Sequence, residues 1–214
     1  SADGTIGYGY SYDKMNRIIK AQSFKLATNA FNLNFIDYDL NGNIQHLNRN
    51  NQSGAAMDGL TYKYIKDGKK SNVLLEVDDS TNDDEGFKNG ANSNSEYLYD
   101  ANGNMTQDLN KEITGISYNY LNLPEKVEKA DGQYIKYIYD AGGAKLAQEV
   151  HAINGDLIKR TDYIGEFIYE SEGANPAELA LIQHEEGRIV PGLSGDWEYQ
   201  YYLKDHLGNT RVTF

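Results

Sequence analysis

One short pattern recurs along this chain and limits what it can fold into. In its clearest copy, residues 97–105, Tyr97 and Tyr99 precede Asp100, and Gly103 follows three residues later. Alternate residues of an extended strand point to the same face, so the two tyrosines are expected on one face. Aspartate suits the first position of a type I turn, and the glycine supplies the positive φ that closes a three-residue hairpin loop. The pattern therefore predicts a β-hairpin.

Further copies of the pattern occupy residues 9–18, 35–44, 117–127 and 136–146, and a weaker copy occupies residues 61–70. The tyrosines nearest the turns lie 19 to 35 residues apart, at Tyr12, Tyr38, Tyr64, Tyr99, Tyr120 and Tyr139. An isolated hairpin is only marginally stable in water, so the units are expected to stack as a repeat array. We predict an all-β protein of tandem hairpins that form a strongly twisted antiparallel sheet.

The repeated residues are predicted to be structural rather than ligand-binding, because rows of large aromatic side chains bury much apolar surface between neighbouring hairpins. The predicted structural set is Tyr10, Tyr12, Asp13, Tyr38, Asp39, Gly42, Tyr97, Tyr99, Asp100, Gly103, Tyr118, Tyr120, Tyr137, Tyr139 and Asp140.

The composition of the chain excludes several functions. Lys and Arg total 20 against 32 Asp and Glu, and this net charge of −12 repels nucleic acid and anionic lipid. Cysteine is absent, which excludes disulfides and thiolate chemistry. No apolar run approaches the roughly 18 residues of a membrane helix, and no signal peptide is evident at the N-terminus. We expect neither a nucleic-acid partner nor membrane insertion.

The organisation predicted for the chain is a single domain over residues 1–214. Repeats cover residues 7–77 and 96–170, and an acidic insertion, expected to be a solvated loop, covers residues 78–95. A short helical turn is expected at residues 176–179, where Pro176 suits a first helical position. Phe214 falls inside an apparent strand, so we expect the chain to be a fragment of a longer protein.

No catalytic or metal motif emerges from the sequence. The spacing of residues 192–195 does not match a nucleophile elbow, and the segment that begins at His184 lacks the second histidine of a zinc protease. Loops that begin at Asp39 and Asp100 superficially resemble calcium loops, but their glycines stand at the fourth position instead of the sixth. We predict a protein that is not an enzyme, with no catalytic residue, no metal and no cofactor.

The Tyr-Asp pairs followed by Asn-Gly-Asn or Gly-Gly resemble the YD repeats of bacterial Rhs proteins. Residues 201–214 resemble the signature of the Rhs repeat-associated core domain in its Bacteroidetes-type form, so residues 171–214 are identified as the start of that region. The core-signature residues are Asp205, His206, Leu207, Gly208, Asn209 and Arg211. Adjacent residues on a strand face opposite ways, so Asp205 and His206 are expected to be structural and not a catalytic pair.

The resemblance implies a function for the chain. Rhs proteins form a spiral β-shell that encloses a C-terminal toxin or effector segment, so this chain would be part of a secreted or cell-surface shell with that segment as its partner. The autoproteolytic site of many relatives lies downstream of the resemblance, so no protease residue is carried over.

An alternative is a cell-surface carbohydrate-binding or adhesion module with glycans as partners. Trp197 is the best candidate for stacking on a sugar ring, with core packing as its structural alternative. Exposed edge strands would in either case favour self-association, with a C2 homodimer as the default symmetry.

Overall fold

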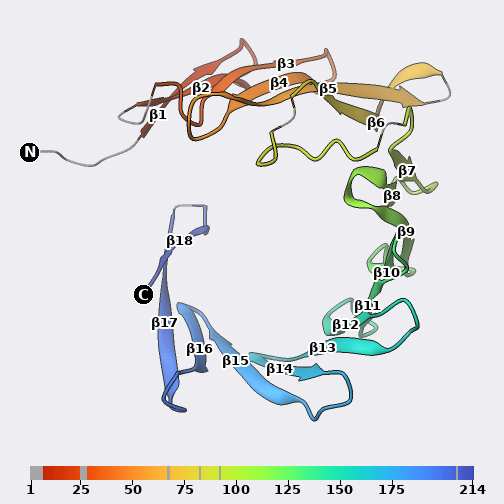
Figure 1. Cartoon of the computed structure of the whole chain (residues 1–214), viewed down its shortest axis with the longest axis vertical. Helices are drawn as coiled ribbons and strands as arrows, with labels where there is room; N and C mark the ends of the chain where they lie inside the picture. Colours follow the sequence, from red (N-terminus) through yellow and green to blue (C-terminus); the bar gives the residue numbers. More distant parts are fainter. Residues whose placement is uncertain (1–6, 25–27, 67, 82, 92, 206) are drawn as a thin grey trace, which may run out of the picture. The chain divides into compact units, whose positions relative to one another are not determined.

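The computed structural model describes residues 7–24, 28–66, 68–81, 83–91, 93–205 and 207–214. In these ranges the regular structure is antiparallel β-strand, except for one 3₁₀ helix, η1 (Leu109–Lys111). The prediction of an all-β protein of tandem hairpins is confirmed (Figure 1). The helical turn predicted at residues 176–179 is wrong, because a strand begins there at Glu178.

The chain forms two compact units, residues 1–112 and 113–214. In the first unit, six antiparallel strands lie side by side in chain order, and the hairpin of β7 and β8 leads into η1. The strands of this unit are β1 (Gly7–Tyr12), β2 (Ile18–Phe24), β3 (Leu33–Tyr38), β4 (Ile44–Asn50), β5 (Ala56–Lys66), β6 (Lys69–Asp79), β7 (Tyr97–Tyr99) and β8 (Met105–Asp108).

In the second unit, each strand pairs antiparallel with the next strand in the chain. These strands are β9 (Ile113–Tyr118), β10 (Pro124–Lys129), β11 (Tyr134–Tyr139), β12 (Lys145–His151), β13 (Leu157–Ile164), β14 (Phe167–Glu172), β15 (Glu178–His184), β16 (Gly187–Pro191), β17 (Trp197–Lys204) and β18 (Thr210–Thr213). The prediction of one domain over the whole chain stays a prediction.

One turn geometry accounts for most of the hairpins. In the described part of the chain, ten turns carry the same pair of backbone hydrogen bonds, between the first and fifth residues and between the fourth and first. The fourth residue always has positive φ, and it is glycine in eight turns and asparagine in two. The ten turns cover residues 13–17, 39–43, 51–55, 100–104, 119–123, 129–133, 140–144, 152–156, 192–196 and 205–209.

The hydrophobic core is small. Its one cluster of described buried residues, Leu60, Val77 and Tyr97, lies in the first unit, against half-buried neighbours that include Phe87 and Tyr99. The chain exposes 14263 Å², whereas even two separate compact proteins of half its mass would together expose only about 12,000 Å². In the second unit, the buried hydrophobic residues among those described are Ala147 and Ile168. Large parts of both sheets therefore have no covering layer.

Candidate functional site

The first candidate group is the set of aspartates that open the repeated turns. Asp100 accepts hydrogen bonds from the backbone N–H of Asn102 (2.9 Å) and of Asn104 (2.8 Å), and from the Asn104 side chain (2.9 Å). The same contacts form at Asp39 and, to backbone donors, at Asp13 and Asp140. The hydrogen bond from the Asn104 side chain is the main cause that lowers the pKa of Asp100. These carboxylates hold their own turns closed.

The core signature at the C-terminus is another turn of this kind. Asp205 accepts from the backbone N–H groups of Leu207 and Asn209, both at 2.9 Å, and forms an ion pair with Arg211 at 2.7 Å. Its pKa is lowered to about 2, first by the hydrogen bond from the Asn209 side chain. Gly208 takes the positive φ position. His206 lies outside the described residues.

In one repeat, the strand ends at a different residue from the one predicted. The turn after β9 opens at Asn119, whose side chain accepts from the backbone N–H of Leu121 (2.9 Å) and Leu123 (3.1 Å). Tyr118 is therefore the last strand residue, and Tyr120, predicted to occupy that place, is an exposed turn residue. Asparagine caps such a turn as aspartate does, so the sequence Tyr-Asn-Tyr offered two possible strand ends.

The predicted tyrosines differ in burial. Tyr97 is buried in the core cluster and Tyr99 packs against it, whereas Tyr10 and Tyr12 are exposed. Among the predicted tyrosines that the structure describes, three donate their hydroxyls to backbone carbonyls elsewhere in the array: Tyr38 to Ile18 (2.8 Å), Tyr139 to Pro124 (3.0 Å) and Tyr120 to Ala141 (3.1 Å). In β11, the rings of Tyr137 and Tyr139 lie 6.4 Å apart on one face. The structural role of the whole set stays a prediction.

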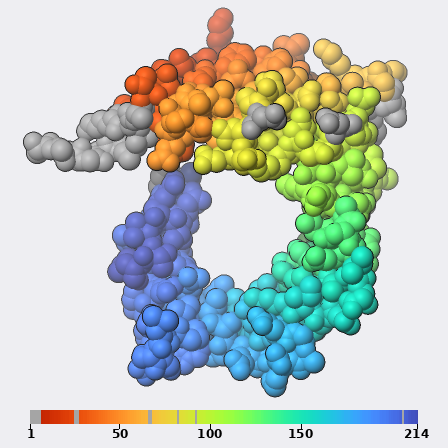
Figure 2. Space-filling model, in the orientation of Figure 1, coloured from red at the N-terminus to blue at the C-terminus, as the bar shows by residue number. Residues whose placement is uncertain are grey.

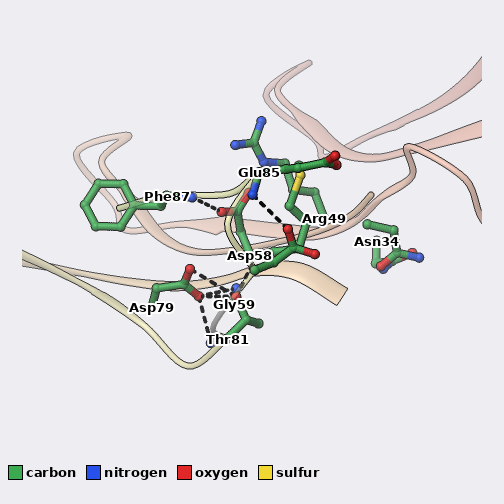
Figure 3. A network of polar contacts seen from close by, with 11 residues as sticks. Asn34, Arg49, Asp58, Gly59, Asp79, Thr81, Glu85 and Phe87 are labelled. Atoms are coloured by element: carbon green, nitrogen blue, oxygen red, sulfur yellow. Dashed lines mark hydrogen bonds and ion pairs between the residues drawn. The ribbon is translucent and has the colours of Figure 1, made fainter. Parts of the chain in front are cut away.

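The segment between β6 and β7 is not the solvated loop that its composition predicted. β6 continues to Asp79, and the described residues of 80–95 lie against the strands of the first unit (Figures 1 and 2). The Asp58 side chain, fully buried on β5, accepts from the backbone N–H of Phe87 at 2.6 Å and pairs with Arg49 of β4 (Figure 3). Asp79 accepts from the backbone N–H groups of Gly59 (2.9 Å) and Thr81 (3.0 Å).

Sequence reasoning missed Asp58, although one signal was present. Asp58 stands two residues before Leu60 and four before Tyr62, so on β5 it shares the face that carries the core. A carboxylate in phase with core positions indicates a buried polar contact.

A second buried carboxylate, Glu96, ties the end of this segment to η1. One oxygen of Glu96, Oε2, accepts from the backbone N–H of Val77 (2.9 Å) and from the Asn110 side chain (2.7 Å). Burial raises the pKa of Glu96. Burial also raises the pKa of Tyr97 to about 12, and the Tyr97 hydroxyl lies 3.3 Å from the Asn110 side chain. Glu96 and Tyr97 therefore both bind the Asn110 side chain, and Glu96 also holds the backbone N–H of Val77.

The terminal hairpin of the second unit carries exposed aromatic side chains on one face. Trp197, Tyr199 and Tyr201 alternate along β17. The rings of Tyr199 and Tyr201 are stacked, with centroids 6.4 Å apart, and the Tyr201 ring lies 5.9 Å from that of Phe214. Trp197 is 44% exposed in this chain, outside the buried core, and its predicted role in glycan stacking stays a prediction.

Among the described residues, no group of three or more His, Asp or Glu side chains is arranged to hold a metal ion. No helix among them is long and apolar enough to cross a membrane. The fold and these contacts define a tandem-hairpin protein whose polar side chains act mainly on its own backbone.

No family model matches the chain, and no curated protein matches it in sequence. Solved structures of toxin complexes are similar to it over most of its length. A crystal structure of TcdB2-TccC3 has a TM-score of 0.49 at 13% identity over 96% of this chain, and a TcdB2-TccC3 structure without the hypervariable C-terminal region has 0.41 at 15% over 97%. The Photorhabdus luminescens Tc holotoxin pore has a TM-score of 0.37 at 12% identity over 97%. The chain spans 13–14% of the length of these matched chains.

Proposed function

We propose that this chain is a non-catalytic, structural stretch of a secreted or cell-surface protein of the Rhs and YD-repeat type. Its hairpins would form part of a shell that encloses or presents a C-terminal toxin or effector segment. The observation that carries the proposal is the array of hairpins in chain order, with uncovered sheet faces. Apolar side chains exposed on a sheet indicate that a further layer of protein lies against them in the working molecule.

The polar chemistry supports a structural role. The buried carboxylates Asp58 and Glu96 are occupied by backbone donors of the same chain, and the turn aspartates close their own loops. The proposal includes neither an enzymatic activity nor a cofactor for these residues.

Limited proteolysis of the parent protein, with the segment that follows residue 214 intact, tests the proposal. We expect that segment to survive protease while the hairpin array is present and to be degraded when it is expressed alone. A second control carries substitutions that disrupt the fold of the downstream segment itself, because protection by a shell does not depend on that fold. Equal cleavage with and without the array would rule out enclosure.

A second candidate function is glycan binding by a surface adhesion module. A row of exposed tyrosines favours it: on β1 the ring centroids of Tyr8 and Tyr10 lie 6.1 Å apart, and those of Tyr10 and Tyr12 lie 6.5 Å apart. Such a row offers flat faces on which sugar rings stack. Calorimetric titration with soluble oligosaccharides tests this candidate, which predicts binding that is lost in Tyr10→Ala.

A further inference from the structure

The largest contiguous group of exposed apolar side chains on a single hairpin is found on β17 and β18. Six side chains form this group, which we call the terminal patch, and they are 39–66% exposed: Trp197, Tyr199, Tyr201, Leu203, Val212 and Phe214. The register brings the two strands together on one face, because Leu203 pairs with Val212 and the backbones of Tyr201 and Phe214 exchange hydrogen bonds of 2.9 and 3.1 Å.

The area of the terminal patch is comparable with that of apolar patches that carry a function. An aromatic side chain offers about 150–250 Å², and four of the six members are aromatic and close to half exposed. The patch therefore approaches the largest apolar patch of a typical monomer, about 300–600 Å². Patches of this size are often functional, as contacts with another protein, a membrane or a ligand.

The charges on the hairpin are separated from the patch. On β17, Glu198 and Lys204 occupy the alternate positions, so they belong to the opposite face, and on β18 Arg211 forms an ion pair with Asp205 of the turn. The chain carries a net charge of −12, and most contacts between two copies would bring carboxylates together. Contact through the terminal patch avoids that repulsion, because none of its six members is charged.

We propose that the terminal patch is an interface between two copies of this chain, packed face to face about a two-fold axis. The patch carries no charged side chain, and its Tyr199 and Tyr201 rings are nearly parallel, with an interplanar angle of 15°. Such a surface is complementary to itself, as an isologous contact requires. A sugar would need polar partners around the rings, whereas Glu198 and Lys204 of β17 belong to the opposite face.

Sedimentation velocity at protein concentrations from about 1 to about 200 µM tests the interface. Trp197, the single tryptophan of the sequence, adds a reporter inside the patch. We expect a reversible dimer, with Trp197 emission that shifts to shorter wavelength as the dimer forms. Tyr199→Lys and Leu203→Lys should each raise the dissociation constant at least tenfold, or about 1.4 kcal/mol. Lysine lowers the net negative charge, so general repulsion cannot explain such a loss.

The matched control is Tyr10→Lys, which places the same charge on an equally exposed tyrosine of β1 and should leave the dissociation constant unchanged. Tyr199→Phe should retain the dimer, and circular dichroism should show that every variant keeps its strands. A monomer throughout the concentration range, or equal weakening by Tyr10→Lys, would overturn the proposal. A Trp197 shift caused by maltohexaose or cellohexaose in a protein that stays monomeric would also overturn it, in favour of a glycan platform.

Discussion

Glu96 forms hydrogen bonds that hold the fold together, but in a buried position that disfavours its ionised form. Its carboxylate is buried and holds Val77 and Asn110 through a single oxygen. Burial disfavours the ionised form, so the pKa of Glu96 is raised in the folded protein. The contribution of this carboxyl group to stability is complete below its unfolded pKa of about 4.3. The contribution is lost as the pH rises through the raised folded value.

Glu96→Gln should therefore stabilise the protein at pH 7. The glutamine carbonyl can accept both hydrogen bonds and stays neutral, so the variant avoids the cost of a buried charge. We expect a melting temperature a few degrees above that of the unsubstituted protein at pH 7, and little difference at pH 4. Denaturant titrations at both pH values measure this. A variant that is less stable at both would show that the hydrogen bonds need the carboxylate.

At the scale of the element, the hairpin turn depends on one backbone conformation. Gly103 has φ +85°, and an added Cβ would meet no atom within 4 Å, so substitution there tests φ alone. Gly103→Ala should cost about 1 kcal/mol, because only glycine adopts positive φ without penalty. Gly9, in β1, also has open space but no positive φ, and Gly9→Ala is the matched control, expected to be neutral or slightly stabilising. Equal effects at both sites would contradict this account.

The hairpins were predictable from sequence because their determinants are local. Asp100 and Gly103 lie within one turn, so the rules of turn chemistry place both correctly. The same rules misplaced Tyr120, because Asn119 caps the turn as well as aspartate does. Residues 80–95 were misread for another reason. Asp58 and Phe87, which hold this segment in place, are 29 residues apart, and no local pattern reports a contact at that distance.

At the scale of the whole molecule, stability is expected to be unevenly distributed. The described core cluster joins residues of β5, β6 and β7, whereas the other strands pair only with their neighbours in chain order and depend on the hairpins beside them. Hydrogen exchange should be slowest around Leu60, Val77 and Tyr97, where the described buried cluster lies, and faster at β17 and β18. Mass spectrometry of peptides after exchange at low protein concentration measures this gradient. Uniform protection along the chain would argue for a single cooperative unit.

The contacts that hold residues 80–95 also determine which amino-acid substitutions this segment can accept. The Asp58 side chain accepts a hydrogen bond from the backbone N–H of Phe87, and the Asn110 side chain accepts one from the backbone N–H of Ala91. Because every residue except proline offers that N–H, these two hydrogen bonds do not depend on which side chains stand at positions 87 and 91. Substitutions at exposed positions such as Asp84, Glu85 and Lys88 are therefore expected to leave both hydrogen bonds in place. A segment whose amino-acid composition suggests a free loop can therefore keep a fixed backbone path.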